Sequence, residues 1–162
     1  MRAEITQMAK GYKAVFEREL AHGSDKVWSM LADNSRLKLW FDELRIAEAG
    51  EDGKMVFDMG EGNNEELAIT DYEEGRVLAF EWWDDHVRFE VSEEDSGKAR
   101  LRLVETIDRI TPQTAKDLAG WHVCLDVIEA ILDGEEINRD EEWQHWHEEY
   151  KRLLDSMTVE FE

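Results

Sequence analysis

The sequence predicts an α+β domain in which an antiparallel sheet is followed by a long helix. The chain has 162 residues, a length that one hydrophobic core can serve. Between residues 44 and 106, short runs of β-forming residues alternate with turns rich in glycine and acidic side chains. Between residues 112 and 133, apolar residues recur at the spacing of an amphipathic helix. We therefore expect one domain over residues 1–162, with its core at about 12–134 and an additional helix at 139–156.

The N-terminal part predicts one strand and two short helices. Residues 12–20 are bounded by glycine-containing turns and carry the β-formers Val15 and Phe16, so they predict a first strand. Ser24 is suited to cap a following helix, in which three apolar residues recur at helical spacing: Val27, Trp28 and Leu31. A second short helix is expected over residues 35–39.

Alternation along the three clearest strands assigns a face to each side chain. These strands are expected at 76–83, 86–93 and 98–106, within an antiparallel meander of six strands. One face collects the apolar residues Leu78, Phe80, Trp82, Val87, Phe89, Val91, Leu101 and Leu103. The opposite face carries the charged residues Arg88, Glu90, Arg100 and Arg102. One side of the sheet is therefore expected to face water and the other side to be covered.

A long helix is the expected cover. Thr111 and Pro112 suit a helix start, and Gly134 suits a helix end. The apolar stripe of this helix consists of Leu118, Trp121, Leu125, Ile128 and Leu132. The apolar face of the sheet is the surface large enough to bury this stripe, so His122 is expected to face outward.

The C-terminal segment over residues 141–154 repeats the helical pattern. Its large side chains are Trp143, Trp146, Tyr150 and Leu153. The segment either continues the covering helix after a break or forms a separate helix that docks on the body or on another subunit. We expect it to pack within its own chain, and a homodimer is the alternative.

The charge of the chain excludes two classes of partner. The sequence holds 19 basic and 40 acidic residues, which give a net charge of −21. Such a field repels phosphate backbones and anionic lipid headgroups, so we expect no binding to nucleic acid and no membrane insertion. The acidity is interpreted as an aid to solubility or as an adaptation to a salty or alkaline habitat. The single cysteine, Cys124, and the lack of an apolar leader in residues 1–11 favour a cytoplasmic location.

Few residues indicate chemistry. His145 and His147 are two positions apart in a helix, about 200° around its axis, so they do not suit one metal ion. We expect no metal site and no cofactor. Glu105 continues the alternation of the last strand onto the covered face, where burial would disfavour its charged form and suit an acid or a base. The alternative is a carboxylate at the sheet edge that reaches solvent or an arginine.

Two segments resemble a known family. Residues 27–41, VWSMLADNSRLKLWF, and residues 120–134, GWHVCLDVIEAILDG, are similar to segments in homologues of the activator of the heat-shock-protein-90 ATPase, within the START-like helix-grip superfamily. Leu78, Phe80 and Trp82 fall where that family places an apolar-aromatic-tryptophan strand. The resemblance spans about residues 12–134.

The resemblance implies a helix-grip fold. In this fold a curved antiparallel sheet of about seven strands wraps around the long helix, two short helices follow strand one, and an internal cavity is enclosed. The superfamily includes lipid carriers, polyketide cyclases and self-resistance proteins, so the resemblance implies no defined reaction. The chain shows no counterpart of the separate chaperone-binding domain of the eukaryotic activators, and a chaperone partner is therefore not expected.

The implied cavity predicts a set of binding residues. The candidates are Trp40, Phe80, Trp82, Phe89, Leu103, Glu105, Trp121, Leu125 and Ile128. The alternative is that these aromatic residues form an ordinary core. Three functions remain, in order of preference: a non-catalytic binder of an apolar small molecule or lipid, a cyclase- or hydrolase-like enzyme that uses the same cavity, and a co-chaperone-like interaction module.

Overall fold

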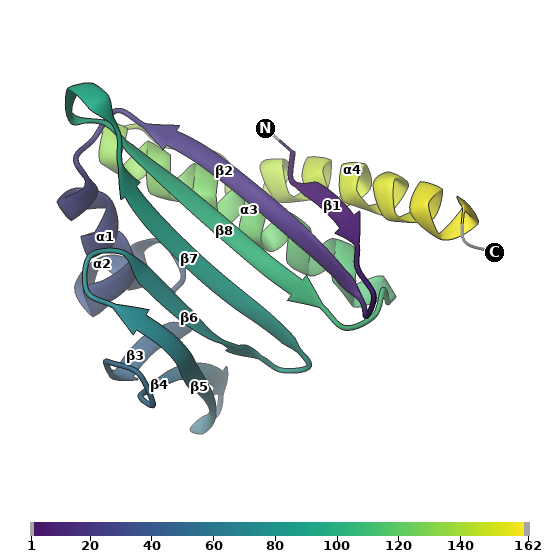
Figure 1. Ribbon diagram of the computed structural model, residues 1–162, viewed down its shortest axis with the longest axis horizontal. Helices are drawn as coiled ribbons and strands as arrows, with labels where there is room; N and C mark the ends of the chain where they lie inside the picture. The colour runs from purple at the N-terminus through teal and green to yellow at the C-terminus, as the bar shows by residue number, and fades with distance from the viewer. Residues whose placement is uncertain (1, 161–162) are drawn as a thin grey trace. The chain divides into compact units, whose positions relative to one another are not determined.

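The protein divides into two compact units. The computed structural model describes residues 2–160, of which residues 3–108 form a unit of strands and two short helices, and the residues from Arg109 onward form a helical unit. Figure 1 labels the elements of both units. The expected α+β class is confirmed: the strands and the two short helices lie in the first unit, and the two long helices form the second unit.

The first unit is built on one antiparallel sheet of eight strands in the order β1-β2-β8-β7-β6-β5-β4-β3. Six of them form the expected meander from β3 to β8, and the expected first strand, β2, pairs with β8. The strands are β1 (Glu4–Gln7), β2 (Tyr12–Leu20), β3 (Leu44–Glu48), β4 (Lys54–Gly60), β5 (Asn63–Glu73), β6 (Val77–Trp82), β7 (Asp85–Glu93) and β8 (Ala99–Ile107).

The prediction of about seven strands missed β1. This strand has four residues and pairs only with β2, and none of its side chains is buried. A short edge strand needs no apolar alternation, because neither of its faces is fully covered. The sequence therefore carries too weak a signal at this position.

Two short helices follow β2, as expected: α1 (Ser24–Ala32) and α2 (Asn34–Trp40). The expected capping role of Ser24 is wrong, because Gly23 occupies the N-cap position and Ser24 is already helical. The second helix begins at a true side-chain cap, in which Asp33 Oδ1 accepts a hydrogen bond from the Ser35 amide at 3.0 Å. The Ser35 hydroxyl donates to the same oxygen at 2.7 Å, and this hydrogen bond, together with that of the amide, lowers the pKa of Asp33.

The predicted polarity of the sheet is confirmed. The apolar side chains assigned to one face by alternation are all buried. On the other face, Arg88 contacts Asp71 at 2.7 Å and Glu90 at 2.8 Å, and Arg102 contacts Glu90 at 3.1 Å. The hydrogen bonds from Arg88 lower the pKa of both carboxyl groups. These side chains are partly exposed, so solvent screens the pairs and the face is mainly a hydrated surface.

The second unit is a pair of helices, α3 (Pro112–Asp133) and α4 (Arg139–Glu160), that pack on each other. The predicted limits of α3 are confirmed. Thr111 Oγ1 accepts from the Gln113 amide at 3.2 Å, and the Thr111 amide donates to Thr114 Oγ1 at 2.9 Å. Gly134 ends the helix in the left-handed conformation, with φ of 72°. In the described residues, no helix is both long and apolar enough to cross a membrane.

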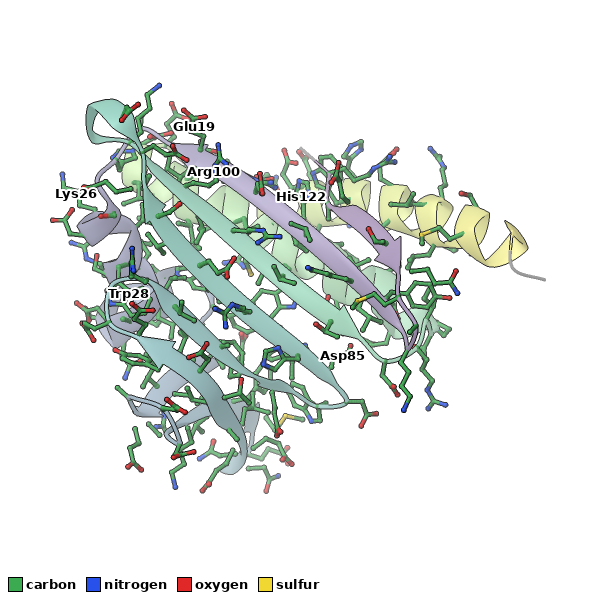
Figure 2. All side chains as sticks on the ribbon, viewed as in Figure 1. Glu19, Lys26, Trp28, Asp85, Arg100 and His122 are labelled. Carbon is green, nitrogen blue, oxygen red and sulfur yellow. The ribbon has the colours of Figure 1, made fainter. Side chains whose placement is uncertain are left out.

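The expectation that His122 faces outward is wrong, because its side chain is 0% exposed. Figure 2 labels this residue on α3. Its ring stacks on Trp146 of α4 with centroids 3.7 Å apart, and its Nδ1 lies 2.7 Å from the hydroxyl of Tyr150. Its Nε2 lies 3.3 Å from Asp126 Oδ2. The apolar stripe of α3 predicts one buried side that excludes His122, whereas packing against α4 also buries the side that carries His122. The segment predicted at 141–154 therefore packs within its own chain.

Candidate functional site

The first unit contains a connected group of aromatic rings, which we call the aromatic cluster. It draws its members from the end of α2 and from strands β4, β6 and β7, together with the turn after β6. The members are Trp40, Phe41, Phe57, Phe80, Trp82, Trp83 and Phe89. Neighbouring centroids lie 4.8–6.3 Å apart, and all pairs but one meet edge to face. This is the geometry in which aromatic rings attract each other.

The cluster runs from the protein surface to the interior. Trp83 is 47% exposed and Phe57 is half-buried, whereas Trp82 is 8% exposed and Phe80 is fully buried. Trp83 contacts both Phe57, at 5.3 Å, and Trp82, at 4.8 Å. A chain of ring contacts therefore joins solvent to the buried rings.

Trp83 holds an unusual backbone conformation. It follows β6 directly, in the turn before β7, and its φ is 55°. A bulky residue rarely adopts this left-handed region, and such strain is found preferentially where a side chain has a function. The turn directs the ring of Trp83 onto Phe57 instead of continuing the alternation of β6.

The buried end of the cluster is fixed by a hydrogen bond. Trp40 Nε1 donates to the carbonyl oxygen of Met30 at 2.7 Å, and its ring meets that of Phe89 at 6.0 Å. This hydrogen bond joins the end of α2 to α1, so the indole of Trp40 keeps one orientation. The inner wall of the cluster is therefore rigid, while its outer member is accessible.

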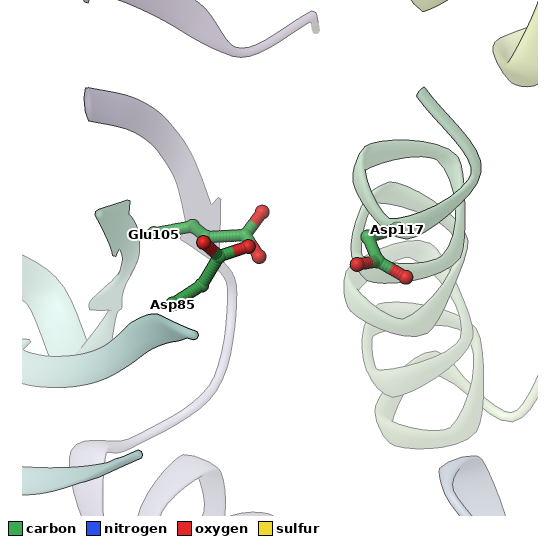
Figure 3. A group of neighbouring side chains, drawn as sticks. All are labelled: Asp85, Glu105 and Asp117. Atoms are coloured by element: carbon green, nitrogen blue, oxygen red, sulfur yellow. The ribbon is translucent and has the colours of Figure 1, made fainter. Parts of the chain in front are cut away.

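Two carboxyl groups adjoin the aromatic cluster on the same face of the sheet. Asp85 pairs with Trp82, and Glu105 pairs with Val87, which in turn pairs with Phe80. Figure 3 shows Asp85 and Glu105 side by side at neighbouring strands, with an oxygen of one within 4.8 Å of an oxygen of the other.

The two carboxyl groups differ in environment. Glu105 is 1% exposed, so the prediction that it lies on the covered face is confirmed and it does not reach solvent. Asp85 is half-buried, and its Oδ1 accepts a hydrogen bond from the Asp108 amide at 3.0 Å. Burial raises the pKa of Asp85, while the Asp108 amide acts in the opposite direction. The pair can accept hydrogen bonds from a guest or hold a proton next to the rings.

The structure brings together six of the nine predicted site residues in the first unit. Trp40, Phe80, Trp82 and Phe89 belong to the aromatic cluster, and Leu103 is buried opposite Phe89 in the β7–β8 register. Glu105 completes this set. The other three residues, Trp121, Leu125 and Ile128, are buried members of α3 in the helical unit, and their place in the same site stays a prediction. Asp117, also drawn in Figure 3, is likewise a residue of α3.

Sequence reasoning missed three members of the aromatic cluster. Phe41 follows the end of α2, and Phe57 lies in a strand with no clear alternation. Trp83 follows the alternating residues of β6 and was assigned no face. The signal that could have found it is a second tryptophan placed in a turn, where a large apolar side chain has no packing reason to be.

Several solved structures share the fold of this chain. A conserved protein of unknown function from Enterococcus faecalis is 24% identical, with a TM-score of 0.79 over 93% of this chain and 91% of that chain. CalU16 from Micromonospora echinospora is 20% identical, with a TM-score of 0.71 over 94% of this chain and 98% of that chain. DynU16, a protein in the dynemicin biosynthetic locus, is 17% identical, with a TM-score of 0.63 over 75% of this chain and 47% of that chain. No curated protein matches the chain.

These comparisons define the class of protein and then its family. The shared fold is an α+β fold with an eight-stranded antiparallel sheet and a long helix, which is consistent with the helix-grip fold, so the predicted fold class is confirmed, with eight strands in place of about seven. Residues 22–133 match the family described as activator of Hsp90 ATPase homolog 1-like protein. The match covers more than half of the sequence, and the chain belongs to this family.

Proposed function

We propose that the protein binds an apolar small molecule or lipid at the aromatic cluster, as a carrier, sensor or sequestering protein. One observation carries this proposal: the rings run without interruption from half-exposed Trp83 to the buried end at Trp40. An ordinary core needs no exposed aromatic residue in a strained turn. A guest that packs against Trp83 would cover this apolar surface and gain the offset-stacked or edge-to-face contacts that aromatic rings favour.

The carboxyl pair defines a second property of the guest. Small-molecule sites combine apolar walls with a few polar anchors. Asp85 and Glu105 adjoin the rings on the same face and can accept hydrogen bonds. A flat apolar guest that carries a hydroxyl or amino group on one side would match this arrangement.

The family and its neighbours are consistent with ligand binding. Two of the similar structures are CalU16 and DynU16, and the second is a protein of a biosynthetic locus. A guest produced by biosynthesis, bound without reaction, fits the aromatic cluster. A cytoplasmic location is consistent with the single, buried cysteine. The acidic composition favours a protein without a nucleic acid partner.

A cyclase- or hydrolase-like enzyme is the second candidate function. Buried Glu105 beside Asp85 favours it, because closely placed carboxyl groups in a low-dielectric site separate into an acid and a base. Glu105→Gln should keep guest binding and abolish turnover if the protein is an enzyme. Turnover of a bound guest by Glu105→Gln at the parent rate would exclude a catalytic role for Glu105.

Fluorescence titration with N-phenyl-1-naphthylamine, a flat neutral fluorophore, tests the binding proposal. We expect saturable emission with one equivalent bound. Trp83→Gly removes the accessible ring and suits the left-handed backbone, so it should weaken binding about fivefold, for the loss of about 1 kcal/mol of ring contacts.

Trp143→Phe is the matched control, because it removes a tryptophan from α4 in the other unit. It should leave the affinity unchanged. A response that rises linearly with probe, or one that Trp143→Phe lowers and Trp83→Gly does not, would contradict the proposal.

A further inference from the structure

A pocket of about 430 Å³ lies within the helical unit, and we call it the hairpin pocket. It is lined by the first turns of α3 and by the C-terminal half of α4. Its volume falls in the range of small-molecule sites, about 300–1,000 Å³. None of its lining residues belongs to the aromatic cluster, so it is a separate site.

The hairpin pocket has an apolar floor. Ala115 on α3 and Leu154 on α4 are both buried, and Ile110 and Pro112 extend the apolar surface toward the start of α3. Pro112 and Ala115 are three positions apart on α3, so they share one side of this helix. Such a floor accommodates a short hydrocarbon chain or ring.

Two lysines stand at the rim of the hairpin pocket. Lys116 extends from α3 and Lys151 from α4, and both side chains are exposed. Neither takes part in an ion pair among the described residues, although the chain carries 40 acidic residues. His147 also lines the pocket, and Asp155 is its acidic member. The rim is thus a cationic position in a chain of net charge −21.

The amides at the start of α3 do not supply this cationic character. The Gln113 amide donates to Thr111 Oγ1, and the Thr114 amide donates to the Thr111 carbonyl oxygen at 3.0 Å. Pro112 has no amide hydrogen. An anion in the pocket would therefore be held by the lysine ammonium groups.

We propose that the hairpin pocket binds a small apolar carboxylate, such as a medium-chain fatty acid. Its hydrocarbon part lies on Ala115 and Leu154, and its carboxylate bridges Lys116 and Lys151. Charge complementarity selects this occupant, because two lysines line the same pocket as the apolar floor. This site is independent of the function proposed for the aromatic cluster.

Isothermal titration calorimetry with sodium decanoate, below its micellar concentration, tests the proposal on the full chain. We expect saturable binding that weakens as sodium chloride rises from 50 to 300 mM, since exposed charges are screened by salt. The double variant K116Q/K151Q should bind at least tenfold more weakly. R152Q is the control, because it removes a positive charge of α4 that lies outside the pocket and pairs with Glu149. Its affinity for decanoate should stay within twofold of the parent.

A second variant tests the floor. A115L places a larger side chain in the hairpin pocket and should also weaken decanoate binding at least fivefold, with folding checked by thermal melting. Absent or non-saturable heat in the parent would overturn the proposal. So would K116Q/K151Q or A115L binding decanoate as tightly as the parent. Loss of decanoate binding in W83G alone would show that the probe occupies the aromatic cluster instead, which also overturns the proposal.

Discussion

Replacing Tyr150 by phenylalanine should destabilise the helical unit measurably. Tyr150 is fully buried, and its hydroxyl lies 2.7 Å from Nδ1 of equally buried His122. A proton on Nε2 of His122, which faces Asp126 at 3.3 Å, leaves Nδ1 free to accept from the tyrosine hydroxyl. Tyr150→Phe keeps the ring and its packing and removes this hydrogen bond.

The magnitude follows from burial. Taking away one partner of a buried hydrogen bond costs about 1–3 kcal/mol, because the remaining group cannot turn to water. In a chain of this length, each kcal/mol lowers the melting temperature by about 2–4 °C. We therefore expect a decrease of about 2–12 °C, measured by circular dichroism at 222 nm and by urea unfolding.

Tyr12→Phe is the matched control, because Tyr12 is only half-buried in β2 of the other unit and should change melting by less than about 2 °C. A second test combines Tyr150→Phe with Asp126→Asn. Since both contacts meet on one imidazole, their effects should not add. Unchanged melting in Tyr150→Phe would refute the view that this hydrogen bond stabilises the α3–α4 pair.

Two further predictions concern stability. Burial raises the pKa of Asp85, so the folded protein holds this proton more tightly than the unfolded chain, and the stability of the fold falls as the pH rises above about 3.8. Asp85→Asn, whose side-chain oxygen can still accept from the Asp108 amide, should therefore raise the melting temperature more at pH 7 than at pH 4. The reverse order would contradict the assignment. Gly134→Ala should destabilise the protein by about 1–2 kcal/mol, because the φ of Gly134 is 72°. Gly120→Ala lies inside α3, with Trp143 Nε1 at 4.0 Å from the new methyl group, and should stabilise the protein by about 0.5–1 kcal/mol. If urea unfolding gave both variants a stability change of the same sign, the assigned end of α3 would be wrong.

The sequence located much of the aromatic cluster, since alternation is a local property. The side chains of Leu78, Phe80 and Trp82 were assigned to one face of a strand, and the structure buries all three. Glu105 was placed on the covered face by the same argument. Trp83 was missed because its orientation depends on a left-handed turn, which no alternation describes.

The sequence by itself determined most of the elements and several of their limits. The start of α3 at Thr111, its end at Gly134, and the bounds of β2 depend on caps, turns and β-formers within a few residues of each boundary. Such signals are local, so they can be read along the chain. The class of the fold followed from the order of these elements.

Tertiary structure alone decided which distant residues meet. The pairing of β2 with β8 and the closeness of Asp85 to Glu105 depend on strand register. The burial of His122 depends on a helix that lies more than 20 residues further along the chain, at Trp146 and Tyr150. These contacts are selected by the total burial that one arrangement of the elements achieves, which no single segment of sequence specifies.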